Sequence, residues 1–308
     1  MEPKDVKEPK PKKNREPLLK QPSSSSALLA APLLRVGKIS YTNCIPFYFG
    51  LQNSPEPDLD FFESYPARIN QAMHCGKIDM APISSLEYLN HQKEYLLLPF
   101  SIGARDFTGS VILFSREKIE GLNGVPIALT RESLSSAGLL KALLKFKFNF
   151  ENEFVVTDSN PFEMLSKNRA ALVIGDDALF YQSREFVYKY DLVELWWNWT
   201  ENPFCFALWA VRRAFAAAHP EEVARFAKRL RQNLEHNLAD IEGLIHRSLG
   251  LTFLDEKFSR IFGYLFNLNY YLDTPTGEGL ELFFRLAHRL RISPRPGPLE
   301  FFNANRPS

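Results

Sequence analysis

Short apolar runs alternate with helical patterns from residue 34 onward, and this alternation limits the fold more than any other feature. The first series predicts strands at residues 33–40, 58–64 and 77–84, and helices at residues 46–52, 66–76 and 85–92. Strands that are interleaved with helices of about ten residues are typical of parallel α/β units. The first half of the chain is therefore expected to form an α/β sheet with covering helices.

A second series of the same kind follows, and then the pattern changes. It predicts strands at residues 110–116, 125–130, 153–158, 170–176 and 204–213, and helices at residues 133–146 and 160–168. Residues 219–290 are then expected to be almost entirely helical. Two α/β series with a helical tail favour a bilobal protein that closes around a small molecule at the carboxyl ends of its strands. We expect lobe 1 at residues 34–112 and 205–308, and lobe 2 at residues 113–204.

The first 33 residues have a different composition, rich in Lys, Glu, Pro and Ser. Such a segment cannot bury a core, and we expect a disordered N-terminal extension. The apolar stretch "ALLAAPLL" after a basic region raises the alternative of a signal peptide. It is only eight residues long, contains a proline and follows a long region that mixes basic and acidic residues. These features favour a cytoplasmic protein over an exported one.

Charge and cysteine content exclude several classes of function. The chain has a formal net charge of +1, of which the first twenty residues contribute +3, so the remainder is close to neutral. We therefore expect no nucleic-acid partner, and nothing indicates a membrane association. The three cysteines are far apart, and the six histidines form no pair at ligand spacing, so the sequence predicts no metal site.

The turn within "GKISYTNCIPFYFGL" is the first candidate for a binding site. Ser40, Tyr41 and Asn43 follow a predicted strand, at the end where α/β sheets bind ligands. Asn43 also precedes a helix with Pro46 in its first turn, so it is equally a candidate N-cap. Cys44 is a candidate nucleophile, because helix N-termini lower thiol pKa values, but no base accompanies it, and we do not expect covalent catalysis.

Serines follow two other predicted strands. Ser84 lies three residues before Glu87, which is the spacing of a capping box and needs no ligand. The helix at residues 133–146 begins with Ser133, Ser135 and Ser136 after Arg131. Unpaired N–H groups and small hydroxyls at the start of a long amphipathic helix suit a carboxylate or a phosphate.

Two further features are ambiguous on local pattern alone. Gly175 ends a strand and allows close approach of the backbone to a ligand, while Asp176 is a candidate helix cap. All four tryptophans occur within fourteen residues. Trp196, Trp197 and Trp199 cannot share one face of a helix, so we expect one of them at the lobe boundary.

Taken together, these motifs resemble the menaquinone-biosynthesis chorismate dehydratases of the futalosine pathway. The resemblance covers residues 34–290 and rests on six motifs in order: "RVGKISYTNCIPF", "IDMAPISSLEY", "SVILFS", "SLSSAGLLKALL", "AALVIGDDAL" and "LWWNWTENPFCFALWAV". It implies a bilobal type II periplasmic-binding-protein-like fold, with two mixed sheets flanked by helices and a helical C-terminal segment. Cys44 and the charged N-terminal extension depart from the family pattern.

The resemblance also implies which residues form the site. Asn43 and Ser110 match residues expected in catalysis, and the other expected contacts with substrate are Ser40, Tyr41, Ser84, Ser135, Ser136, Gly175 and Asp176. The implied reaction removes water from chorismate and gives 3-[(1-carboxyvinyl)oxy]benzoate, with no metal or organic cofactor. The sequence leaves the proton acceptor open, with a water, the enolpyruvyl carboxylate of the substrate and Asp176 as candidates.

Two alternatives with the same fold remain. A solute-binding protein of an importer would bind a ligand without chemistry and would require export. The related 1,4-dihydroxy-6-naphthoate synthase opens with a Ser-Pro-Cys-Pro-Asn-type turn and uses a histidine in its cleft. This chain has no histidine in its second α/β series, and the dehydratase is therefore favoured. The sequence does not indicate an oligomeric state.

Overall fold

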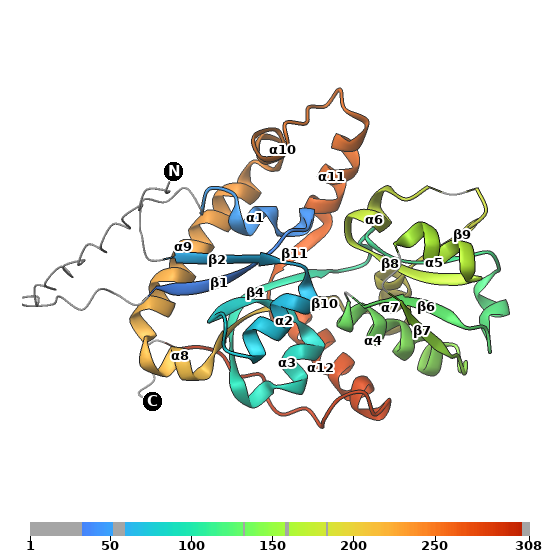
Figure 1. Ribbon diagram of the computed structural model, residues 1–308, viewed down its shortest axis with the longest axis horizontal. Helices are drawn as coiled ribbons and strands as arrows, with labels where there is room; N and C mark the ends of the chain where they lie inside the picture. Colours follow the sequence, from blue (N-terminus) through green and yellow to red (C-terminus); the bar gives the residue numbers. More distant parts are fainter. Residues whose placement is uncertain (1–32, 52–58, 132, 158–159, 183, 304–308) are drawn as a thin grey trace, which may run out of the picture. The chain divides into compact units, whose positions relative to one another are not determined.

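The computed structural model describes residues 33–51, 59–131, 133–157, 160–182 and 184–303 (Figure 1). The described residues from Leu33 onward form one compact unit. The predicted N-terminal extension lies outside the described residues, apart from Leu33. The division of this unit into the two expected lobes stays a prediction.

The first sheet has six strands within the described residues, in the order β11-β4-β10-β3-β1-β2. Its strands are β1 (Leu34–Ile39), β2 (Leu59–Ser64), β3 (Met80–Ser84), β4 (Tyr95–Ala104), β10 (Phe204–Arg212) and β11 (Leu268–Tyr271). β1 is parallel to β2 and β3, whereas β10 is antiparallel to β3 and β4, and β11 is antiparallel to β4. The sheet is therefore mixed, as expected.

The second sheet has five strands within the described residues, in the order β7-β6-β8-β5-β9. They are β5 (Val111–Ser115), β6 (Ile127–Thr130), β7 (Phe154–Thr157), β8 (Ala170–Ile174) and β9 (Tyr188–Asp191). β6 is parallel to β7 and β8, while β5 is antiparallel to β8 and β9. Both mixed sheets of the expected fold are thus present, and this prediction is confirmed.

Helices connect strands of both sheets, and further helices come after β10 in the chain. They are α1 (Ile45–Tyr48), α2 (Pro66–His74), α3 (Ser85–Asn90), α4 (Leu134–Ala142), α5 (Pro161–Lys167), α6 (Gly175–Phe180), α7 (Leu192–Thr200), α8 (Arg213–Ala218), α9 (Pro220–Ala239), α10 (Ile241–Leu249), α11 (Glu256–Asn267) and α12 (Thr274–Arg289). Short 3₁₀ turns occur at η1 (Thr42–Cys44), η3 (Gln92–Glu94) and η4 (Ile119–Leu122), and a π-helical turn, η5 (Leu143–Lys147), extends α4. None of the described helices is both long and apolar enough to span a membrane.

Three strands were not predicted from the sequence: β4, β9 and β11. β4 is a long apolar run interrupted by Pro99, and a proline within a run argues against a strand. The register between β4 and β10 shifts between Leu208 and Ala210, and this irregularity accommodates the proline. Residues 219–290 were expected to be almost entirely helical, and β11 is an exception, because Leu268, Asn269 and Tyr271 pair with β4.

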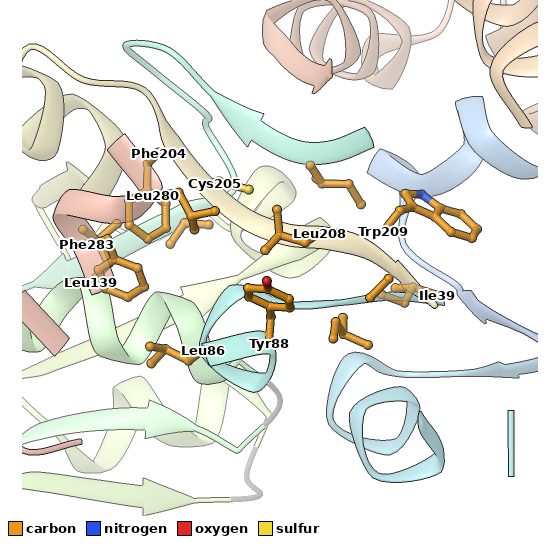
Figure 2. Close-up of a cluster of buried hydrophobic side chains, with 14 of the residues drawn as sticks. Ile39, Leu86, Tyr88, Leu139, Phe204, Cys205, Leu208, Trp209, Leu280 and Phe283 are labelled. Carbon is orange, nitrogen blue, oxygen red and sulfur yellow. The ribbon is translucent and has the colours of Figure 1, made fainter. Parts of the chain in front are cut away.

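Side chains of β10 pack in the hydrophobic core beside the first sheet. Figure 2 shows Tyr88 facing Leu208, while Phe204 of the same strand groups with Leu280 and Phe283 of α12. The rings of Phe204 and Phe283 lie edge to face, with their centroids 4.8 Å apart. All of these side chains are buried, so α3 and α12 are fixed against the strand by hydrophobic burial.

The tryptophans divide between core and surface. Trp196 of α7 is fully buried and packs edge to face on Phe204, so it belongs to the core. Trp197 is half-buried, and the guanidinium of Arg105 lies 5.1 Å from its ring centroid. Arg105 lies on the segment that joins the two sheets. Trp197 thus contacts the segment that joins the two sheets, and its position at a lobe boundary stays a prediction.

The chain passes between the two sheets twice, at residues 105–110 and at residues 192–203, and Asp191 joins the two passages. Its Oδ2 accepts the backbone N–H groups of Thr108 and Gly109 at 3.1 and 2.6 Å. Its Oδ1 accepts those of Val193 and Glu194 at the start of α7, at 2.8 and 3.3 Å. Burial raises the pKa of Asp191 to about 6, and these four N–H groups oppose a larger rise.

Candidate functional site

A cavity with about 660 Å³ of empty space, its open mouth included, lies among the carboxyl-terminal ends of strands from both sheets. Seven of the nine predicted site residues line it: Tyr41, Asn43, Ser84, Ser110, Ser135, Ser136 and Gly175. Ser40 and Asp176 are not among the lining residues.

The opening turn forms the cavity wall through η1 rather than through a helix cap. The N-cap position of α1 belongs to Cys44, and Asn43 lies within η1 and caps no helix, so the N-cap prediction is wrong. The reason is that the chain turns into η1 two residues earlier than the helical pattern indicated. The Oδ1 of Asn43 accepts a hydrogen bond from the Cys44 thiol at 3.2 Å. Its amide nitrogen donates to no described residue and remains for a ligand.

Cys44 has the environment of a core residue. It is 1% exposed, and burial raises the pKa of its thiol. A thiolate is the nucleophilic form, and an apolar enclosure disfavours it more than a helix terminus favours it. The prediction that Cys44 performs no covalent chemistry is consistent with this burial.

Asp176 contacts the opening turn, and no cap is formed. Each of its carboxylate oxygens lies 3.4 Å from the backbone nitrogen of Thr42. The N-cap of α6 is Ile174, so the prediction of Asp176 as a cap is wrong. Burial raises the pKa of Asp176 above its ordinary value, and the hydrogen bonds from Thr42 oppose the rise. Asp176 therefore supports the turn from behind the cavity wall.

Gly175 is required by the backbone. Its φ is +66°, a conformation that favours glycine, and its N–H donates to the carbonyl oxygen of Ser110 at 2.7 Å. A Cβ at this position would lie 3.4 Å from the ring of Tyr41. This distance is an ordinary van der Waals contact, so the preference for glycine at position 175 comes from its φ.

Hydrogen bonding distinguishes the serines at the start of α4. Ser85 donates its single hydroxyl proton to the carbonyl oxygen of Cys205, and its Oγ lies 2.9 Å from the Oγ of Ser135. Ser135 must therefore be the donor in that pair, and it also accepts the N–H of Leu86. Its proton is already used, whereas the hydroxyl of Ser136 has no hydrogen-bond partner among the described residues. Ser136 can donate to a ligand and Ser135 cannot.

Ser84 is arranged as a donor by the residues around it. As N-cap of α3 it accepts the N–H of Glu87 at 3.2 Å, so this half of the predicted capping box is confirmed. It also accepts from the side-chain amide of Asn70 at 3.1 Å. Both acceptor positions of its oxygen are occupied, and the hydroxyl proton is left to point elsewhere.

α4 begins at the predicted serines but is not amphipathic as predicted. Its N-cap is Ser133, whose Oγ accepts the N–H of Ser136 at 3.3 Å. The helix was expected to be amphipathic, but buried residues lie all round it, and this prediction is wrong. α4 is enclosed by α3, α7 and α12, and it therefore has little polar face.

Ser110 and Tyr264 form the opposite part of the wall. The Oγ of Ser110 lies 2.9 Å from the Oγ1 of Thr108, on the passage that Asp191 holds. Tyr264 of α11 is 3% exposed, and its buried phenol oxygen has no partner within hydrogen-bond distance in the described part of the chain, while the nearby side chains of Ser110 and Asn43 act to lower its pKa. Burial raises the pKa of this phenol, so Tyr264 is a neutral donor. Because Tyr264 lines the cavity, this hydroxyl can donate a hydrogen bond to a ligand there.

Sequence reasoning missed Tyr264, because α11 reads as a helix of the tail. Phe258, Ile261, Tyr264 and Leu265 form its buried face. A tyrosine on an otherwise aliphatic and phenylalanine face is the signal that could have identified it, since a buried phenol needs a partner.

Ser40 lies away from this cavity. It is exposed, and its hydroxyl donates to Glu63 at 3.0 Å. The strand alternates its side chains between faces, so Ile39 lines the cavity and Ser40 does not. No Asp, Glu, His, Lys or Arg lines the cavity within the described residues. Its polar groups are hydroxyls, the Asn43 amide and the backbone.

Comparison with known proteins identifies the fold and the family. A chorismate dehydratase from Thermus thermophilus is 28% identical over 268 residues, which cover 80% of this chain and 93% of that protein. Protein AF1704 from Archaeoglobus fulgidus superposes with a TM-score of 0.64 at 18% identity, covering 84% of this chain and 98% of its own. The alkanesulfonate-binding protein SsuA from Xanthomonas axonopodis has a TM-score of 0.55 at 14% identity, covering 86% and 96%.

The likeness to binding proteins such as SsuA shows the fold alone, which is the periplasmic-binding-protein fold expected from the sequence. The family is shown by a second comparison. The profile of a family described as menaquinone biosynthesis matches residues 34–289, nearly the whole of the described body. The chain therefore belongs to the menaquinone-biosynthesis family.

Proposed function

We propose that this protein is a chorismate dehydratase, a carbon–oxygen hydro-lyase that converts chorismate to 3-[(1-carboxyvinyl)oxy]benzoate and water. The similarity to the Thermus thermophilus enzyme and the family assignment support the substrate. The observation that carries the proposal is the donor set of the cavity. Ser84, Ser136, Tyr264 and the Asn43 amide all present protons that no described residue accepts.

The reaction needs such donors. Loss of the proton on the ether-bearing ring carbon moves negative charge through the ring double bond onto the carboxylate. The neighbouring hydroxyl then leaves, and the ring becomes aromatic; the proton and the hydroxide together make one water. Neutral donors fixed in a cavity stabilise the charge that develops on the carboxylate. We assign this task to Ser136 at the start of α4, where the helix dipole adds to it.

The remaining donors suit the leaving group and the second carboxylate. Asn43 has its amide oxygen fixed by the Cys44 thiol, which turns its NH₂ group toward the cavity. We assign Asn43 to the leaving hydroxyl and Tyr264, with Ser110 beside it, to the enolpyruvyl carboxylate. Tyr264 remains protonated because burial raises its pKa, so it donates and does not act as a base.

The side chains that line the cavity limit which group can accept the proton. No lining residue among those described carries a carboxylate, an imidazole or an amine, and Asp176 is held by Thr42. We therefore place the proton on the enolpyruvyl carboxylate of the substrate or on a water. The role of first enzyme of the futalosine pathway, and a cytoplasmic location, belong to the same proposal.

An assay of the purified protein with chorismate tests the proposed dehydratase activity. We expect an aromatic product, followed by ultraviolet absorbance, and a large loss of kcat in Asn43→Ala. Asn198→Ala, an exposed asparagine of α7, is the matched control and should keep full turnover. A thermal shift with chorismate but no product would instead favour a binding protein. Turnover of cyclic de-hypoxanthine futalosine in place of chorismate would assign the chain to the naphthoate synthase.

A further inference from the structure

Two histidines and a buried glutamate meet at the ends of α2 and α3, among residues that do not line the cavity. His74 is the last residue of α2, and Glu87 lies one helical turn before His91 at the end of α3. One side-chain ligand atom from each of the three lies within 4.8 Å of the others. Glu87 and His91 are four residues apart, but His74 comes from a different helix, so the sequence shows no pair of histidines at ligand spacing.

Glu94 of η3 holds both imidazole rings in one orientation. Its Oε2 lies 3.3 Å from the Nδ1 of His74, and its Oε1 lies 3.4 Å from the Nδ1 of His91. The two ring centroids are 4.0 Å apart. A histidine that binds a metal through Nε2 commonly donates its Nδ1–H to a carboxylate, which fixes the ring and its tautomer. Glu94 provides this arrangement for both rings.

The contact between His91 and Glu87 is unlike an ordinary hydrogen bond. The Nε2 of His91 lies 3.6 Å from the Oε1 of Glu87, which is too long for a direct bond. Two ligand atoms that each lie about 2 Å from one tetrahedral ion are separated by roughly 3.3 Å. The observed separation is therefore close to that of two ligands around one ion.

The carboxylate of Glu87 also lacks a cation of its own. Its side chain is 11% exposed, and within the described residues it pairs with no lysine or arginine. Its other contact is the Tyr95 hydroxyl at 3.5 Å. A buried carboxylate without a fixed positive partner is costly, and a bound divalent cation removes that cost.

We propose that His74, Glu87 and His91 bind one Zn²⁺ ion, with Glu94 as the carboxylate that orients both rings. Two imidazoles and one carboxylate suit zinc, and the fourth position is left for water. The ion joins the end of α2 to the end of α3. Pro66, the first residue of α2, and Ser84, the N-cap of α3, both line the cavity. This site is independent of the proposed dehydratase reaction, which needs no metal.

Titration calorimetry of the full chain with Zn²⁺ tests the proposal. We expect saturable binding of one ion per chain. His74→Gln and His91→Ala should each weaken the affinity at least tenfold, and Glu94→Gln should weaken it about 10- to 100-fold. Each variant's thermal unfolding without metal is measured alongside. His74→Gln changes an exposed side chain and is the variant that tests the ligand set if His91→Ala unfolds.

Two controls separate this site from adventitious binding. Cys75 is an exposed thiol next to His74, and Cys75→Ser should retain the affinity. His246→Ala, an exposed histidine of α10, should do the same. Cobalt(II) should give visible bands without the thiolate charge-transfer absorption of a Cys ligand. Absence of saturable binding, unchanged affinity in His74→Gln, or loss of binding in Cys75→Ser would overturn the proposal.

Discussion

The Oγ atoms of Ser85 and Ser135 lie 2.9 Å apart and join the first turns of α3 and α4. Because Ser85 donates to Cys205, Ser135 must donate to Ser85, and its proton is not available to a substrate. Ser135 and Ser136 were treated alike in the sequence analysis. In the structure, Ser135 joins two helices through its hydroxyl, whereas the hydroxyl of Ser136 is left to donate to a ligand in the cavity.

This difference predicts opposite effects for two alanine variants. Ser135→Ala leaves the N–H of Leu86 without its acceptor and should lower the free energy of unfolding by about 1–3 kcal/mol. Ser136→Ala breaks no side-chain hydrogen bond in the described structure, so stability should change little while kcat/KM for chorismate falls at least tenfold. Urea unfolding and steady-state kinetics of both variants check this. Equal effects of the two variants on both measurements would contradict the distinction.

Tyr264→Phe should reduce turnover of chorismate by about 10²-fold, because it removes a fixed donor from the cavity. The free energy of unfolding of Tyr264→Phe should stay the same or rise, because the substitution removes a buried hydroxyl that has no hydrogen-bond partner. Tyr270→Phe is the matched control. Its hydroxyl is also buried without a partner, but Tyr270 does not line the cavity. Thermal unfolding and kcat are measured for both, and a similar loss of turnover in Tyr270→Phe would remove Tyr264 from the site.

The fold was predictable because its pattern is local. Alternating apolar runs identified most strands of both sheets, and motif order identified the family. β4 and β11 were missed for a physical reason: their pairing joins segments more than 160 residues apart, as between Leu268 and Ala104, and no local pattern encodes it. The same limit applies to His74 and His91, which lie on different helices and meet only in the folded chain, with their ring centroids 4.0 Å apart.

The site was partly predictable for a related reason. Polar residues at strand ends identified Asn43, Ser84 and Ser136, because α/β sheets place ligands there. Tyr264 reaches the cavity from a helix of the tail, so no strand-end rule applies to it. The direction of a hydroxyl proton, which separates Ser135 from Ser136, depends on partners far away in the sequence and cannot be read from a motif.

Asp191 predicts a pH dependence of stability. Burial raises its pKa from 3.8 to about 6 in the folded protein, so the folded state binds this proton more tightly than the unfolded chain. The contribution to stability is complete below about pH 4 and is lost as the pH rises through about 6, by up to about 3 kcal/mol. Asp191→Asn should remove this slope. Urea unfolding of both proteins between pH 4 and pH 7 measures it, and parallel curves would contradict the assignment.

Gly175→Ala should destabilise the protein and lower turnover together. The φ of +66° costs an alanine about 1 kcal/mol, and its Cβ would add a methyl group to the cavity lining, in van der Waals contact with the ring of Tyr41 at 3.4 Å. Gly250→Ala is the matched control, with a φ of +68° and no atom within 4 Å of its Cβ. Both variants bear the same backbone cost, so any additional loss of kcat/KM in Gly175→Ala comes from the contact with Tyr41 and the cavity wall. Chemical unfolding and chorismate kinetics of the pair separate the two effects, and identical kinetics would show that Tyr41 and Gly175 do not shape the site.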